Sequence, residues 1–237
     1  YAALKTHYRP SHADLTAVRK FGGFNDPRGG GHFSGRITLG LVAAGVVAKK
    51  MLGERVRFST QIVEIGGCTD PARFDDLLRE TAAAKDSVGG IVECRAEGVM
   101  PALGEPFFDS TESLIAHLLF SVPAVKGVEF GSGFAAARMR GSEHNDPIVD
   151  ASGLTATNHA GGIVGGLTNG NPLVVRAAVK PTASIAREQM TYNLATDRME
   201  PLEIRGRHDV CIALRAAVVV EAAVAIALED LLLRCRA

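Results

Sequence analysis

Hydrophobic and polar positions along the chain follow two different periods, and these predict both strands and helices. Alternating or continuously apolar runs of strand length lie at 58–65, 90–96, 125–130 and 173–179. Apolar residues with helical spacing cover about 34–52, 70–85, 110–118 and 212–234. The last of these segments is apolar almost all the way round, which is typical of a helix buried in a core. Residues 1–33 are rich in turn formers and predict no long regular element.

Residues at the ends of the predicted helices support these boundaries. Ser34 is a good N-cap for the first helix, and Lys49 falls in its last turn, where the helix dipole favours a cation. Asp70 followed by Pro71 is typical of a helix start. Strands and helices follow one another without regular strand–helix–strand alternation, which indicates an α+β fold rather than a doubly wound parallel sheet. With no long linker in the sequence, we expect residues 1–237 to form a single domain.

Composition and charge exclude two broad classes of protein. The chain has 237 residues, of which 46% are hydrophobic, and its 26 Lys and Arg residues balance 26 Asp and Glu residues. A disordered chain would combine low hydrophobicity with a large net charge, and a general nucleic-acid binder would be basic. Glycine is enriched, at 26 residues or about 11% against about 7% on average, so the chain should contain many tight turns or close backbone approaches.

Cysteine spacing and the distribution of charges bear on the compartment of the protein. The four cysteines form no CxxC pattern, and we expect them to be buried thiols of a reducing compartment. The first residues lack the apolar core of a signal peptide. The apolar run at 212–233 carries four charged residues, Arg215 and Glu221 among them, which argues against a membrane span. We therefore expect a cytoplasmic protein.

Two glycine-rich segments are candidates for ligand binding. Residues 28–36 place three successive glycines before a helix, between two arginines, so free amides and the helix dipole could receive an anion. The same pattern also fits a flexible loop. Residues 158–170 contain five glycines, which indicates either a flat ligand lying on this backbone or tight packing of other backbone against it. Neither segment has the spacing of a dinucleotide fingerprint or a phosphate loop.

Several charged side chains add to this picture. Residues 180–184 place a lysine and two hydroxyls directly after an apolar strand, which suits a phosphate or a capped turn. We expect Arg215 to be buried in the last helix, where it would need a partner: Glu221, another part of the fold, or a bound anion. His12 could exchange protons near neutral pH or lie in solvent. No hydrolase or zinc motif is present, so the residues favour a small polyanionic ligand, such as a planar phosphorylated cofactor.

Taken in order, these segments are similar to the motifs of the chorismate synthase family. The family patterns RPGHAD, RGGGRSSAR, SNNAGGILGGISNG, KPTPSI and GRHDPC correspond to residues 9–14, 28–36, 157–170, 180–185 and 206–211, followed by Arg215. Residues 104–106 and 125–129 also fit the family. The resemblance extends over essentially the whole chain.

This resemblance implies a fold, a reaction and a cofactor. The family fold is a β-α-β sandwich with helices packed between sheets, assembled as a homotetramer with FMN near subunit contacts. The family reaction is the 1,4-elimination of phosphate from 5-enolpyruvylshikimate 3-phosphate to give chorismate, in the shikimate pathway of aromatic amino acid biosynthesis. This lyase reaction depends on reduced FMN, with NADPH as a candidate source of reducing equivalents. No nucleic acid and no membrane is implied as a partner.

The resemblance also assigns roles to individual residues. His12 matches the histidine that protonates the reduced flavin, and Asp209 matches the aspartate that assists proton removal at the flavin. Arg36 and Arg215 match arginines that hold the substrate's anionic groups, and Arg9 is a further candidate. The positions that match flavin contacts are His32, Phe33, Ser34, Pro123, Ala124, Gly165, Lys180, Pro181, Thr182, Ala183, Ser184 and Arg207.

Three departures from the family pattern leave alternatives open. The N-terminal GESHG-like motif of the family has no counterpart in these residues, His32 and Phe33 replace an arginine and a serine, and Val210 replaces a proline. One alternative is a non-catalytic FMN- or anion-binding homologue, or an inactive fragment that lacks the N-terminal motif. Another is a flavin reductase that uses a nicotinamide, although the sequence has no separate dinucleotide fingerprint.

Overall fold

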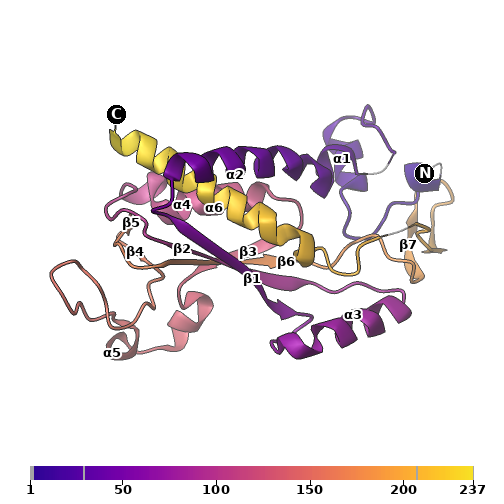
Figure 1. The fold of residues 1–237 in the computed structure, drawn as a ribbon. Coiled ribbons are helices and arrows are strands. Elements are labelled where there is room, and N and C mark those ends of the chain that lie inside the picture. Colours follow the sequence, from indigo (N-terminus) through magenta and orange to yellow (C-terminus); the bar gives the residue numbers. More distant parts are fainter. Residues whose placement is uncertain (1–2, 29, 207, 237) are drawn as a thin grey trace.

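A four-stranded antiparallel sheet forms the centre of the computed structural model, which describes residues 3–28, 30–206 and 208–236. The strand order is β1-β2-β6-β3, with bounds β1 (Arg57–Ile65), β2 (Gly90–Glu97), β6 (Leu173–Val179) and β3 (Val125–Phe130). Three helices cover one face of this sheet (Figure 1): α2 (Leu39–Leu52), α4 (Thr111–Ser121) and α6 (Ala213–Arg236).

Strand register divides the sheet into an apolar face and a polar face. Cys94 lies opposite Val175 and Val92 opposite Ala177, and these side chains pack under the helices. The alternate positions carry a polar row across all four strands: Gln61, Glu93, Arg176 and Glu129. Glu93 is only 3% exposed, and the Nε atoms of Arg176 and Arg95 donate to its two carboxylate oxygens over 2.7 and 2.8 Å. Because a buried carboxylate needs such partners, this row ties neighbouring strands together.

The helix layer is held by close backbone packing and one polar cluster. Gly45 of α2 lies so near α6 that a Cβ atom on it would stand 2.4 Å from the Cβ atom of Ala222. Beside this crossing, Lys49 Nζ donates to Glu221 Oε1 over 2.6 Å, and Thr60 Oγ1 donates to Glu221 Oε2 over 2.8 Å. Glu221 therefore joins α2, α6 and β1.

Smaller elements lie at the two ends of the sheet. The hairpin of β4 (Ile163–Val164) and β5 (Leu167–Thr168) adjoins the start of β6, and α5 (Gly141–His144) lies at the same end. The other end carries α1 (Asp14–Lys20) and a hairpin of β7 (Gln189–Asn193) and β8 (Arg198–Leu202). Helix α3 (Phe74–Ala83) lies on the side of the sheet opposite α2 (Figure 1).

Most predicted elements are confirmed. The α+β class holds, with helices packed against a sheet in which all strand pairs are antiparallel. The strands at 125–130 and 173–179 have the predicted bounds. The helix predicted from Ser34 begins as a 3-10 turn capped by Ser34 and continues as α2. The sequence predicted no regular element in residues 1–33, where the structure has helix α1. It also predicted no strands at 189–202, where β7 and β8 form a hairpin.

The four cysteines are free thiols, as predicted, but they are not all buried. Cys94 and Cys211 are buried, Cys68 is half-buried and Cys235 is exposed near the end of α6. The expectation of four buried cysteines was therefore wrong for Cys235, which is exposed in the last turn of α6, and for Cys68, which is only partly covered. No helix within the described residues is both long enough and apolar enough to cross a membrane.

Candidate functional site

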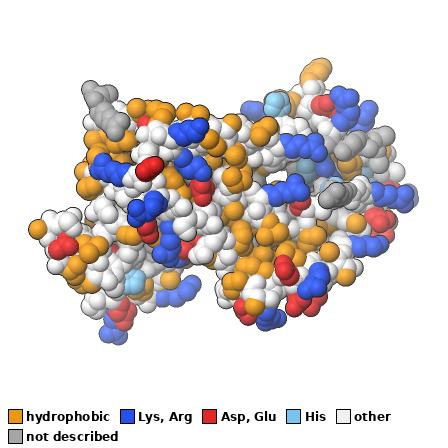
Figure 2. Space-filling view, in the orientation of Figure 1, with side chains coloured by type: hydrophobic (Ala, Val, Ile, Leu, Met, Phe, Trp, Pro, Cys, Tyr) orange, Lys and Arg blue, Asp and Glu red, His pale blue; other side chains and the backbone are white. Residues whose placement is uncertain are grey.

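The predicted site residues converge mainly on one end of the sheet. The N-terminal ends of α2 and α6 both point to this end, where α1 also lies (Figure 1). Figure 2 shows Lys, Arg and His side chains gathered around a hollow on the same side of the molecule. Two helix N-termini contribute partial positive charge in addition to these cations, so this end of the fold is suited to anions.

Arg9 is the centre of a buried polar cluster. Its side chain is only 6% exposed, and its Nε and Nη2 atoms donate to the two carboxylate oxygens of Asp14 over 2.8 and 2.7 Å. Nη1 donates to Ser184 Oγ over 3.1 Å, which links the 9–14 segment to the 180–184 segment. His12 Nδ1 lies 2.6 Å from Asp14 Oδ1 and 3.1 Å from Arg9 Nη2. The cluster therefore brings together Arg9, His12 and Ser184, three of the predicted residues.

Sequence reasoning missed Asp14. Burial on its own would raise the pKa of the Asp14 carboxyl, but hydrogen bonds from Arg9 and His12 outweigh burial and hold the pKa well below its usual range. Asp14 is therefore an anion that accepts from both neighbours. Its place in the RPSHAD segment, two residues after His12 and five after Arg9, was the available signal for this role.

Lys180 connects three segments of the site. Its Nζ atom donates to the Ser11 carbonyl over 2.6 Å, and its backbone N–H donates to the Ala124 carbonyl over 2.9 Å. The structure therefore places Ala124, which follows Pro123 and has a φ of +77°, beside the 180–184 segment. Ser87 Oγ donates to the carbonyl of Thr182 over 2.7 Å. The hydroxyl oxygen of Thr182 is itself buried and has no hydrogen-bond partner among the described residues.

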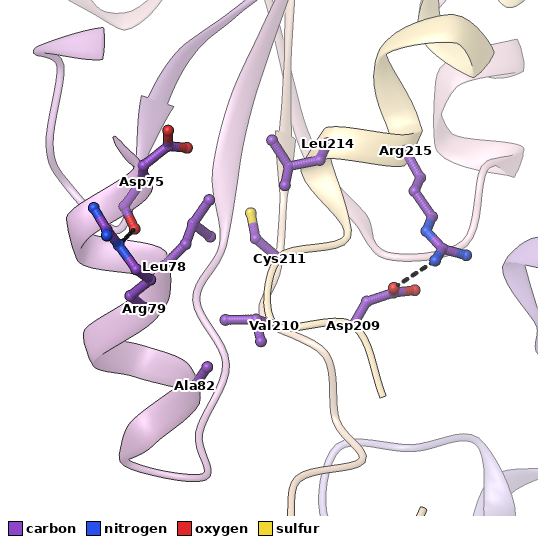
Figure 3. A pocket seen from close by; sticks show the side chains of 9 residues that line it. All are labelled: Asp75, Leu78, Arg79, Ala82, Asp209, Val210, Cys211, Leu214 and Arg215. Carbon is purple, nitrogen blue, oxygen red and sulfur yellow. Dashed lines mark hydrogen bonds and ion pairs between the residues drawn. The ribbon is translucent and has the colours of Figure 1, made fainter. Parts of the chain in front are cut away.

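A hollow of about 650 Å³ lies between α3 and the head of α6. Figure 3 shows Asp209 and Arg215 on one side of it, joined by an ion pair of 3.0 Å, and Cys211, whose Sγ atom lies 3.8 Å from the Gly89 carbonyl oxygen, between them and α3. The expectation that Arg215 is buried was wrong, because its side chain is 73% exposed on the first turn of α6. Its partner is Asp209, whereas Glu221 pairs with Lys49. Arg215 can therefore offer its outer face to a ligand while it contacts Asp209.

The segment after the triple glycine lies against the same helix head. His32, Phe33 and Ser34 are in or next to 3-10 turns, and Ser34 Oγ accepts a hydrogen bond from the backbone N–H of Arg36. A Cβ atom on Gly35 would lie 3.8 Å from Ile212, just before α6 begins. Arg36 is exposed. The structure thus places Arg36 on the segment that packs against the head of α6, the helix that carries Arg215.

Gly165 lies away from the other predicted flavin contacts. It is at the turn between β4 and β5, in a segment whose Gly162 lies against Leu173 at the start of β6, whereas Lys180 follows the end of β6. The two ends of this seven-residue strand are roughly 20 Å apart. For the rest of the 158–170 segment, the sequence left two alternatives open: a flat ligand on the backbone, or tight packing of other backbone against it. The structure supports tight packing, because a Cβ atom on Gly161 would stand 2.3 Å from the backbone nitrogen of Gly131.

The 206–211 segment completes the site. His208 was not among the predicted residues, and its pKa is lowered by partial desolvation and by the positive charge of Arg9, against the opposing charge of Asp209. The charge of Arg9 therefore reaches His208, which precedes Asp209 in the chain. Arg207, a predicted flavin contact, lies outside the described residues.

Comparisons with known proteins agree with this arrangement. The sequence model of the chorismate synthase family matches residues 1–233. A chorismate synthase of Chitinophaga pinensis is 60% identical over 233 residues, which cover 98% of this chain and 69% of that protein. A chorismate synthase of Dehalococcoides mccartyi is 45% identical over 261 residues, which cover 99% of this chain and 72% of that protein.

A solved structure supports the same relationship. It is described as a crystal structure of chorismate synthase, with a TM-score of 0.70 and 29% sequence identity. The match covers 85% of this chain and 65% of that one, so this chain spans a little under two thirds of the solved protein's length. Together with the order of the motifs and their convergence at one end of the sheet, these matches show that the chain belongs to the chorismate synthase family.

Proposed function

We propose that this chain carries the flavin and substrate site of a lyase that eliminates phosphate from 5-enolpyruvylshikimate 3-phosphate to give chorismate, and that it works with reduced FMN. Family membership supports the reaction class. The convergence of Arg36, Arg215, Lys180 and two helix N-termini at one end of the sheet supports a polyanionic ligand.

The observation that carries the flavin proposal is the hydroxyl of Thr182. A buried hydroxyl without a partner costs free energy, so its place beside Lys180 and Ser184 fits a bound group that accepts or donates a hydrogen bond there. Residues 180–184, Ala124 and the 32–34 segment would hold the FMN. When bound, reduced FMN supplies electron density to the substrate while phosphate departs.

The arginines divide into two kinds. Arg36 and Arg215 are exposed, so they can bind the carboxylates or the phosphate of the substrate. Arg9 is buried and donates to Asp14 and Ser184, so it holds the site segments together more than it binds substrate directly. His12 and Asp209 are the residues that hold and accept protons beside these anions.

Assembly as a homotetramer belongs to the same proposal. Within one protomer, Gly165 and Lys180 lie at opposite ends of β6, so a flavin that contacts both would need Gly165 from a second copy. A hydrophobic surface is available for such contacts: Leu39, Val47 and Met51 of α2 are exposed.

Anaerobic titration of the chain with reduced FMN, with and without the enolpyruvyl substrate, tests this proposal. We expect flavin binding and the appearance of chorismate absorbance in the same cuvette. Lys180→Met should weaken flavin binding, whereas Lys85→Met, which removes an exposed lysine after α3, should not. Flavin binding without chorismate would contradict the reaction, and no binding of either ligand would contradict the whole proposal.

A further inference from the structure

The Nδ1 atom of His12 lies between a hydrogen-bond acceptor and a donor. Asp14 Oδ1 is 2.6 Å away and can only accept while the carboxyl is ionised, and Arg9 Nη2 is 3.1 Å away and can only donate. A contact of 2.6 Å between a ring nitrogen and a carboxylate oxygen requires a proton between them, because two lone pairs would repel at that distance. The 2.6 Å contact between His12 Nδ1 and Asp14 Oδ1 therefore indicates that Nδ1 carries a proton.

We infer that Asp14 is a positioning residue that fixes the His12 ring with its proton on Nδ1, and so leaves Nε2 as the atom that exchanges a proton with the bound ligand. The first part rests on the contacts alone. The second part rests on the proposed function. Similar carboxylate–histidine pairs orient the ring and select its tautomer in other proteins.

The surroundings of Asp14 keep it in the orientation that this role needs. Its Oδ2 atom accepts from the backbone N–H of Arg9 over 3.1 Å and from Arg9 Nε over 2.8 Å, and Oδ1 accepts from Arg9 Nη2 over 2.7 Å. Three donors on one neighbour leave the carboxylate little freedom to rotate. Arg9 is in turn held by Ser184.

The other charged groups near His12 do not compete for its Nδ1 proton. Lys180 Nζ donates to the carbonyl of Ser11, and the charge of Arg9 reaches His208 on the 206–211 segment. Lysine and arginine side chains have no acceptor atoms. Among the described residues that contact His12 Nδ1, Asp14 is therefore the one that can accept its proton in a hydrogen bond.

Asp14→Asn should reverse the tautomer. The donors of Arg9 would select the amide oxygen for the Oδ2 position, where two of them converge, which places the amide NH₂ group towards His12. A donor facing Nδ1 requires an unprotonated nitrogen there, so the proton would move to Nε2. Asp14→Glu keeps an acceptor-only carboxylate and should retain the proton on Nδ1.

The test is ¹⁵N NMR of the histidine rings in this chain at pH 8, with the His12 signals assigned from His12→Gln. We expect a protonated Nδ1 in the wild type and in Asp14→Glu, and an unprotonated Nδ1 in Asp14→Asn. Asp230→Asn, which breaks an exposed pair with Arg234 on α6, is the matched control and should leave the His12 signals unchanged.

Two outcomes would overturn the inference: an unprotonated Nδ1 in the wild type, or the same Nδ1 state in the wild type and Asp14→Asn. Loss of the Nδ1 proton in both Asp14→Asn and Asp14→Glu would also overturn it, because the packing of the side chain, rather than its ability to accept a hydrogen bond, would then determine the tautomer of His12. The NMR signals need neither flavin nor turnover, so failure of the proposed function would show separately, in the titration described above. If both proposals hold, Asp14→Asn should lower kcat by roughly a hundredfold, the scale of one misplaced acid–base group, with KM little changed.

Discussion

At the scale of single residues, removal of the buried Thr182 hydroxyl should affect the stability of the chain and its affinity for FMN in different ways. Thr182→Val keeps the shape of the side chain and removes a polar atom that has no partner among the described residues. We expect the free energy of unfolding of the ligand-free chain to stay the same or rise, because an unsatisfied buried group disappears. FMN affinity should fall by about tenfold, which corresponds to the loss of one hydrogen bond worth about 1.4 kcal/mol.

Thr111→Val is the matched control for this substitution. The Thr111 hydroxyl is buried and donates to the Leu103 carbonyl over 2.8 Å. Its removal should lower the free energy of unfolding by about 1 kcal/mol and leave FMN affinity unchanged. Urea unfolding and fluorescence titration measure the two quantities, and a destabilised Thr182→Val would contradict the prediction.

Cysteine reactivity should follow burial. Burial raises the pKa of the Cys94 thiol to about 12 and also raises the pKa of Cys211, so both remain protonated at pH 8. Cys235 is exposed. Iodoacetamide at pH 8 should therefore alkylate Cys235 well before Cys94 and Cys211, as followed by peptide mass spectrometry. Rapid labelling of Cys94 in the folded chain would contradict this burial.

Sequence analysis singled out segments that the fold brings together, but it did not predict which side chains contact one another. The motif around His12 identified the segment, yet only the fold shows that Asp14 accepts from both Arg9 and His12. Arg215 was expected to be buried because its neighbours along the chain are apolar. Its exposure arises because it lies on the outer face of α6 with Leu214 and Val218, whereas Ala213 and Ala216 of the same turn face the core.

At the scale of elements, the crossing of α2 and α6 depends on Gly45. A Cβ atom there would meet Ala222 of the other helix at 2.4 Å, so Gly45→Ala must push the helices apart. We expect the free energy of unfolding to fall by about 2 kcal/mol. Gly40→Ala, in the same helix but with nothing within 4 Å, should raise it by about 0.5 kcal/mol because alanine favours the helix. Equal effects in urea unfolding would contradict the close crossing.

The polar row of the sheet makes stability depend on pH. Burial would raise the pKa of Glu93, but hydrogen bonds from Arg95 and Arg176 outweigh it, so the pKa lies below its ordinary value of 4.5. A carboxyl with a lowered pKa contributes stability above its unfolded-state pKa and loses that contribution as the pH falls.

We therefore expect the free energy of unfolding to fall below about pH 4.5, and to fall less steeply in Glu93→Gln. Urea unfolding at a series of pH values measures both slopes. Glu97→Gln is the control, because Glu97 pairs with Arg57 at an exposed position of the same strand and should leave the slope unchanged. Parallel curves for the wild type and Glu93→Gln would contradict a stabilising role for the buried carboxylate.

Strand β6 was predicted with its observed bounds because its apolar residues form an almost continuous buried run. Strands β3 and β6 follow from their apolar residues and flanking turns. Strands β7 and β8 are short and half polar, and His7 forms an isolated bridge to Asn193, so they depend on contacts between distant segments. The local pattern of apolar and polar residues therefore gives little indication of such a hairpin.

At the scale of the whole molecule, the exposed apolar side of α2 predicts self-association. Leu39, Val47 and Met51 are each at least half exposed, which is unusual for one helix face of a monomer. Val47→Glu should place a charge in the contact and reduce the mass measured by light scattering after gel filtration. Ala83→Glu, at an exposed position of α3, should not change the mass. A monomeric wild-type chain would contradict this prediction.

The position of β6 has a consequence for how the protein folds. β6 lies between β2 and β3, yet it follows both of them in the chain, so a growing polypeptide displays two unpaired strand edges until residues 173–179 have emerged. Insertion of this strand closes the sheet through contacts between distant segments, which is a slow kind of step in refolding. Lys180 and its neighbours follow immediately, so the end that carries the candidate site is assembled only as the sheet closes. A chain arrested before that point would be prone to aggregate and would lack the proposed binding site.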